Sequence, residues 1–250
     1  MKQTLILMLI LLFAAGPAIA QDEDDYRPNR RQRGGGIVGG GGGVTPTWFF
    51  LNTQNLNTAL AEKGFPQLSE DGLFMFGGHG YAYILLIPNL RLGGMGFGGT
   101  LEERRDFGGL YQSTRLEVGA GGVTIEYVIP FGRFHVALGG MIGGGSYTLT
   151  MTQAENTDKT WGGLFPSDLG SNPRGRHELE RSFLAWQPGL TLEYEVHPFV
   201  ILGLTGGWYG SSGGEWRLDD QFDMTEMPDF DFDGGFVRLG LTVGLFLGEN

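Results

Sequence analysis

The 250-residue chain contains no cysteine, only three lysines and, beyond its N-terminus, no long apolar run. Without cysteine there is no disulfide framework, no lipid-anchored cysteine and no thiolate metal site. The formal net charge of −11 excludes nucleic acid as an expected partner, because that role needs a basic surface. No segment after residue 20 reaches the ~18 apolar residues of a membrane-spanning helix, so none is predicted.

Glycine is what the chain has in excess. It supplies 46 of the 250 residues, far above the usual ~7%. Aromatic residues make up 12%, which argues against a disordered chain of low complexity. Glycine weakens a strand interior, so its recurrence in stretches such as 135–145, HVALGGMIGGG, requires an explanation.

The N-terminus predicts secretion. Lys2 precedes a short apolar run that ends in Ala18-Ile19-Ala20, the small-x-small pattern of a signal-peptidase site. Residues 1–20 are therefore predicted to be a signal peptide, since the run is too short for a membrane anchor. Residues 21–43 combine an acidic cluster, a basic cluster and many glycines, which predicts a Gly-rich disordered linker.

From residue 44 onward the pattern is typical of strands. Eight strand-like segments are expected at 44–51, 72–86, 89–103, 113–129, 132–152, 182–196, 199–218 and 234–248. One helix is predicted over 53–63, with Thr53 or Asn55 as its cap and Gly64 as its stop.

The connections between these segments alternate in length. Three loosely similar hairpins each carry a tyrosine, a tight turn near Pro88, Pro130 or Pro198, and then glycines. The other connections are expected to be long, over 52–71, 104–112, 153–181 and 219–233. Short turns at one end and long loops at the other are typical of outer-membrane barrels.

The two faces of the strands differ in a way that a water-soluble barrel would not show. In 234–248, Val237, Leu239, Leu241, Val243 and Leu245 share one parity, opposite small residues and Arg238. Leu190 and Leu192 likewise oppose Glu193. A soluble barrel would expose lysine and glutamate and bury its large aliphatic side chains. A large aliphatic face opposite a small, sparsely charged face indicates that the aliphatic face meets lipid.

The charges on the other parity are predicted to line the lumen. These are Arg91, Arg115, Glu117, Glu126, Glu193, Glu195 and Arg238. The aliphatic parity within 113–129 changes between Ala120 and Val123, and a β-bulge at Gly121-Gly122 is the predicted cause. Small inward residues would leave room for these charges in a narrow barrel.

This organisation predicts an all-β fold: one eight-stranded antiparallel up-and-down transmembrane β-barrel over 44–250, with one short helix in a loop. It resembles the small outer-membrane barrels of the OmpA and OmpX type, in architecture and without a specific family motif. The resemblance implies the bacterial outer membrane as location and the lipid bilayer as partner. Chains of this class usually end in an aromatic residue, whereas this one ends Leu247-Gly248-Glu249-Asn250, with Phe246 nearby.

One acidic loop suggests a cation site. Asp229, Asp231 and Asp233, followed by Gly234, match the start of a calcium loop. The twelfth position holds Gly240 where an EF-hand needs a bidentate glutamate, so only a looser Ca²⁺ or other divalent-cation site is a hypothesis, and no other cofactor is expected.

No enzyme activity is predicted. The four histidines, His79, His135, His177 and His197, are expected at different depths, and no Ser-His-acid set is legible. The glycine-rich strings do not open a helix after a strand, so nucleotide binding is not supported. The sequence favours a structural or interaction role at the cell envelope, with envelope proteins or polysaccharide as partners through long loops. A porin-like transport barrel, a soluble periplasmic barrel for a small apolar ligand and a lipid-modifying barrel enzyme remain open alternatives.

Overall fold

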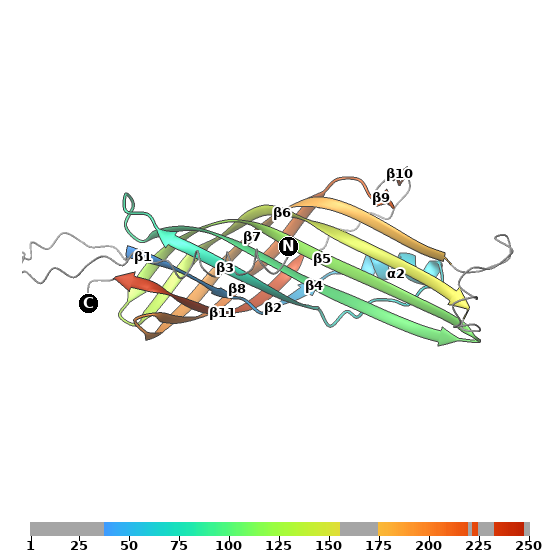
Figure 1. Ribbon diagram of the computed structural model, residues 1–250, viewed down its shortest axis with the longest axis horizontal. Helices are drawn as coiled ribbons and strands as arrows, with labels where there is room; N and C mark the ends of the chain where they lie inside the picture. The colour runs from blue at the N-terminus through green and yellow to red at the C-terminus, as the bar shows by residue number, and fades with distance from the viewer. Residues whose placement is uncertain (1–37, 156–174, 220–221, 225–232, 248–250) are drawn as a thin grey trace, which may run out of the picture. The chain divides into compact units, whose positions relative to one another are not determined.

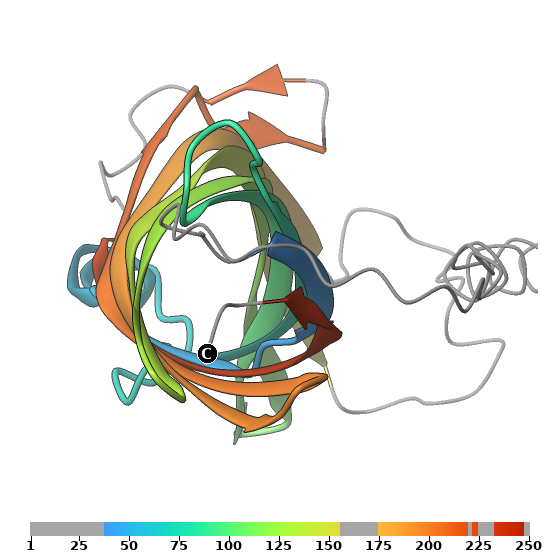
Figure 2. The ribbon, with the colours of Figure 1, turned by 90° about the vertical axis from the view of Figure 1, so that its left-hand side faces the viewer.

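Eight antiparallel strands, each hydrogen-bonded to its neighbours, close into a ring (Figure 2). This computed structural model describes residues 38–155, 175–219, 222–224 and 233–247. The first strand of the ring is made of two pieces, β1 (Val38–Val44) and β2 (Thr47–Leu51). The others are β3 (Leu73–Tyr83), β4 (Leu90–Phe107), β5 (Leu110–Phe131), β6 (Phe134–Glu155), β7 (Gly175–His197), β8 (Val200–Gly213) and β11 (Gly234–Leu247). The predicted fold class is confirmed.

The ring closes where its first strand, made of β1 and β2, pairs with the last strand, β11. Strand β1 pairs with β11 on one side and with β3 on the other, and β2, after the Thr45-Pro46 interruption, does the same. The predicted linker therefore ends earlier than expected, because 38–43 form strand β1, whereas 1–37 lie outside the described residues. A β-carbon at Gly43 would lie only 1.7 Å from the Leu241 carbonyl oxygen, so the glycines allow a very close approach of β1 and β11.

Strands β4 to β7 are much longer than the others and rise beyond the ring (Figure 1). We call their upper part the extension; it comprises residues 100–107, 110–117, 148–154 and 175–181. The long loop expected over 104–112 is wrong, because β4 and β5 are joined by Gly108 and Gly109 alone. Their φ angles of 58° and 85° are those of a two-residue hairpin turn, which needs positive φ at both positions.

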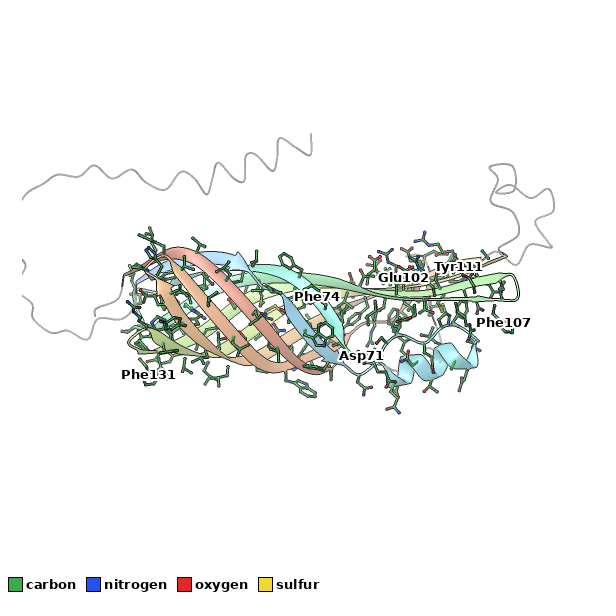
Figure 3. The ribbon with its side chains drawn as sticks, turned by 90° about the horizontal axis from the view of Figure 1, so that it is seen from below. Asp71, Phe74, Glu102, Phe107, Tyr111 and Phe131 are labelled. Atoms are coloured by element: carbon green, nitrogen blue, oxygen red, sulfur yellow. The ribbon has the colours of Figure 1, made fainter. Side chains whose placement is uncertain are left out.

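The helix lies in the connection from β2 to β3. This helix, α2, spans Gln54–Glu62 within the predicted range 53–63. Gly64, whose φ is 75°, follows its C-terminal end as predicted. Asn57 donates to the Leu68 carbonyl oxygen and accepts from the Leu68 amide, at 2.9 and 2.8 Å, which ties the following loop to the helix. Figure 3 shows the helix beside the β4–β5 hairpin that carries Phe107 and Tyr111.

Two short strands, β9 (Arg217–Leu218) and β10 (Phe222–Asp223), form a small flap. The flap pairs with β7 at Leu179 and Glu180, so it lies along one edge of the extension. No helix among the described residues is long and apolar enough to cross a membrane.

Candidate functional site

The outside of the ring is an apolar belt. Leu190, Leu239 and Val243 are exposed over 54%, 58% and 58% of their surface, as the parity of the strands predicts. The same belt includes Ile125, Leu138, Ile142, Leu184, Leu192, Leu202, Leu204, Val237, Leu241 and Leu245. Such a continuous aliphatic surface is unstable in water and is required of a barrel wall that faces lipid.

Exposed aromatic side chains lie at both margins of this belt. Trp48, Phe50, Phe74 and Trp208 occupy the margin toward the extension, and Phe131, Phe134, Tyr194 and Phe199 the margin at the short turns (Figure 3 labels Phe74 and Phe131). Two such girdles are typical of transmembrane barrels. Four other aromatic side chains near the strand ends point inward instead, namely Phe49, Tyr81, Tyr83 and Tyr209.

Above the belt, the outer face becomes polar and apolar side chains of the core lie inside. Along β5, even-numbered residues stay inside over the whole strand: Leu116 and Val118 in the upper part, Thr124 and Glu126 in the lower. The pairing of β5 with β4 and β6 runs through Gly121-Gly122 without a shift in register, so the predicted bulge is wrong. What changes at this level is the surroundings of the wall, not the direction of its side chains.

Two of the residues predicted to carry lumen charges do not lie in the lumen. Arg115 and Glu117 lie on the outside of the extension, 47% and 48% exposed, and form an ion pair with each other at 2.7 Å. Odd-numbered residues of β5 point outward along the whole strand. The outward aliphatic residues of the belt are therefore followed, on the same face, by outward polar residues in the extension. Glu195 shares the inward parity of Glu193 and is half-buried near the end of β7.

The interior of the ring has three layers. The uppermost is a large apolar core with Phe49, Phe97, Tyr147, Phe183 and Tyr209 among its members. Leu56, Leu60 and Leu68, from α2 and the loop after it, belong to the same core. The helix thus packs against the inner face of the extension.

The middle layer is polar and contains four of the predicted lumen charges, Arg91, Glu126, Glu193 and Arg238. Arg91, from β4, is 3% exposed and pairs with Glu126 of β5 at 2.8 Å and with Glu193 of β7 at 2.7 Å. The second pair crosses the lumen, since β4 and β7 are not neighbours in the ring. The Arg91 guanidinium also lies 4.1 Å from the centre of the Tyr81 ring.

Arg238 occupies the same layer with neutral partners. It donates to Thr47 Oγ1 at 3.2 Å and to the Gln187 side-chain oxygen, and its guanidinium lies over the Phe236 ring. His79 Nε2 lies 2.8 Å from Thr242 Oγ1. Because these groups come from several strands, the polar layer connects opposite sides of the barrel wall across the lumen.

A small aromatic and aliphatic cluster closes the lower end. It consists of Tyr81, Tyr83, Val128 and Ala137, with Phe246 packed against it. His135, near this end, has its Nδ1 atom 3.9 Å from Glu193 Oε2. His177 and His197 are exposed on the surface.

The predicted cation site lies mostly outside the described residues. Asp229 and Asp231 lie outside the described residues, and Asp233 accepts a hydrogen bond from the Ser211 amide at 2.8 Å. Within the described ranges no group of three or more histidine or acidic side chains could hold a metal ion.

The apolar belt, its aromatic margins and an interior filled by side chains define the class: a small β-barrel of the outer-membrane type. No protein family matches the chain, and no curated protein matches its sequence. Solved structures that it is similar to include outer-membrane proteins.

Three of these structures illustrate the likeness. Ail, the attachment invasion locus protein of Yersinia pestis, shares 13% identity over 84% of this chain and 99% of its own, with a TM-score of 0.41. The outer membrane protease OmpT of Escherichia coli shares 9% over 84% and 95%, with a TM-score of 0.39. A major outer membrane protein of Thermus thermophilus shares 10% over 82% and 99%, with a TM-score of 0.43. Identities this low say nothing about function, so function is inferred below from the chain's own residues.

Proposed function

We propose that this protein is a non-conducting barrel of the bacterial outer membrane that holds the extension outside the cell as an interaction surface. The observation that carries the proposal is the inversion of polarity along β4 to β7. Below it, the outer face suits lipid; above it, the outer face is charged and hydroxylated, and the inner face carries Leu116, Leu149 and Leu179 of the apolar core, which suits water. The extension is therefore built to stand in solvent on a membrane anchor.

The length of the strands supports this division. A tilted strand crosses a bilayer in about 9–11 residues. Strands β5, β6 and β7 have 22, 22 and 23 residues, about twice that length. Roughly half of each strand is thus available for a role outside the bilayer.

Solute transport is disfavoured by the filled interior. The apolar core, the ion pairs of Arg91 and the lower cluster follow one another along the axis. The two cavities of the polar layer measure about 50 and 20 Å³, which is space for water but not for nutrients.

One edge of the extension is open to a partner. Residues 100–107 of β4 pair with β5, and among the described residues no backbone group bonds their other side. The Leu90 carbonyl oxygen accepts from Ile84 of the β3 side, so by alternation the amides and carbonyls of Glu102, Arg104 and Asp106 point away from β5. An edge of this kind accepts an extended polypeptide strand, and its charges restrict which strand pairs there.

The placement of the extension is tested by labelling, because the chain has no native cysteine. Glu117→Cys, Ile125→Cys and Arg133→Cys place one thiol on the extension, the belt and a short turn. A membrane-impermeant maleimide on intact cells should label only the variant at Glu117. The variant at Arg133 should react only once the outer membrane is permeabilised, and the one at Ile125 in neither case. Labelling at Arg133 and not at Glu117 on intact cells would reverse the orientation and reject the proposal.

The absence of transport is tested in planar bilayers. The refolded barrel should insert without producing stable conductance steps, because no continuous aqueous path runs along the axis. Reproducible open-channel events from the wild-type chain would favour the porin-like alternative.

A further inference from the structure

The outer face of the extension has a column of three threonines at its centre. Thr148, Thr150 and Thr152 point outward from β6, because Leu149, between the first two, lies in the apolar core. All three are half-buried, and neighbouring ones are about 6.7 Å apart, which is two residues along an extended strand. We call these three residues the hydroxyl column.

Charged side chains of the neighbouring strands flank the hydroxyl column on both sides. Arg115 of β5 and Glu178 of β7 lie directly opposite Thr150, and Glu180 of β7 lies opposite Thr148. Side chains on directly opposite residues are close enough to contact the same molecule. A ligand that lies along the column therefore meets hydroxyl, carboxylate and guanidinium groups together.

The charges of this face are largely neutralised within the protein. Each of its three arginines has a glutamate two positions away on its own strand. The pairs are Arg104–Glu102, Arg115–Glu117 and Arg176–Glu178, at 2.8, 2.7 and 2.7 Å. A phosphate or sulfate group would have to displace one of these carboxylates and would also meet the charges of Glu180 and Asp106. An anionic partner is therefore disfavoured.

The same face offers little to a protein partner. The contacts that dominate protein interfaces come from large side chains that become fully buried, aromatic ones above all. Within the four strands of the extension, as far as they are described, Tyr111 is the one aromatic residue that points outward, at the upper end of β5 (Figure 3). An array of short hydroxyls and paired charges instead suits a ligand that donates and accepts hydrogen bonds at many points.

We propose that the outer face of the extension binds an uncharged polysaccharide outside the cell, with the sugar chain lying along the hydroxyl column. This inference rests on the proposed function, because it requires the extension to stand in solvent. Sugar hydroxyls donate to the carboxylates of Glu178 and Glu180, accept from Arg115, and do both with the threonines. The Tyr111 ring gives the less polar face of one sugar a surface to stack on.

The charge argument is tested with polysaccharides that share a backbone. Dextran, mannan and laminarin, which are uncharged, and sulfated dextran are passed over the wild-type barrel in lipid nanodiscs, and binding is followed by surface plasmon resonance. We expect at least one uncharged polymer to bind, with an affinity that changes less than about twofold between low and high salt, because no ion pair forms. Binding of none of the uncharged polymers, or tighter binding of sulfated dextran than of dextran, would overturn the proposal.

The place of binding is tested by isosteric substitutions. Thr150→Val removes one hydroxyl and keeps the size of the side chain, so it should weaken binding of the tightest uncharged polymer about tenfold. Thr150→Ser keeps the hydroxyl and should stay within about twofold of the wild type. Thr58→Val, at an exposed threonine of α2, is the matched control and should leave binding unchanged. Equal binding by the wild type and by Thr150→Val would reject the hydroxyl column as the site.

Failure of this inference is distinguishable from failure of the proposed function. If Glu117→Cys is labelled on intact cells but no uncharged polysaccharide binds, the extension stands outside the cell and only the inference is rejected. If Arg133→Cys is labelled on intact cells instead, both are rejected.

Discussion

At the scale of single residues, position relative to the lumen decides what a charge contributes. Arg91 and Arg115 are both strand arginines paired with glutamate, but one pair lies inside the ring and the other on the wet face of the extension. A buried charge left without its partner costs far more than an exposed one, because water cannot solvate it.

Arg91→Ala should therefore lower the free energy of unfolding by about 3–5 kcal/mol, since it leaves the buried Glu193 and the half-buried Glu126 without their partner. Arg115→Ala, the control, should change it by at most about 1 kcal/mol. Both values follow from urea unfolding of the refolded barrel, observed by tryptophan fluorescence. Equal effects of the two substitutions would mean that Arg91 is solvated and that the polar layer is open to bulk water.

Glycines also differ in how closely a neighbouring strand approaches them. A β-carbon at the inward-facing Gly143 would lie 2.0 Å from the Gly121 carbonyl oxygen of the neighbouring strand, whereas at the outward-facing Gly119 it would meet nothing within 4 Å. A glycine at such a close approach permits the strong coiling of a narrow barrel.

Gly143→Ala should destabilise the barrel by about 1–3 kcal/mol, as overpacking does. Gly119→Ala should be neutral or stabilise it by up to about 1 kcal/mol. The temperature at which the folded band shifts to the unfolded band on a gel compares the two variants. A stable Gly143→Ala barrel would contradict the close approach of β5 and β6.

At the scale of elements, the extension is a sheet with unlike edges. The flap of β9 and β10 covers the β7 edge, whereas residues 100–107 of β4 leave the other edge without a strand among the described residues. The Arg105 side chain donates to the Gly64 carbonyl oxygen, which connects this edge strand to the end of α2.

Proline substitutions test which backbone groups face this edge. Arg104→Pro removes an amide that points away from β5 and should cost less than about 1 kcal/mol. Glu103→Pro removes an amide that bonds to β5 and should cost about 3 kcal/mol or more. Unfolding in urea gives both values. If Arg104→Pro cost more than Glu103→Pro, the amide of Arg104 would be the one that bonds to β5. Strand addition at this edge would then lose its basis.

At the scale of the whole molecule, the parity of aliphatic residues was sufficient to predict the ring of eight strands and the direction of its walls. It was not sufficient to locate the water boundary. A change of polarity along β5 has two explanations, a bulge or a change of surroundings, and the side chains alone do not distinguish them. Contacts distant in sequence, such as Gly121 opposite Gly96 and Gly144, settle the register.

Two other errors have a common cause. The glycines of β1 and the Gly108-Gly109 turn carry no side chain from which a face can be read, so the first was predicted to be a linker and the second part of a loop. Strand β1 is held by backbone hydrogen bonds to β3 and β11, and a backbone bond leaves no trace in composition. The polar layer was predicted only in part, because its partners come from strands far apart in the sequence.

The central claim is that one continuous wall meets lipid in its lower half and water in its upper half. Nitroxide labels on single cysteines at each position from Arg115 to Tyr127 of β5, in the barrel reconstituted in vesicles, test it most directly. Labels at Val123, Ile125 and Tyr127 should be accessible to oxygen and not to a nickel chelate, labels at Arg115 and Glu117 the reverse, and labels at Thr124 and Glu126 to neither. Nickel access at Val123 and Ile125, or oxygen access without nickel at Glu117, would contradict this account.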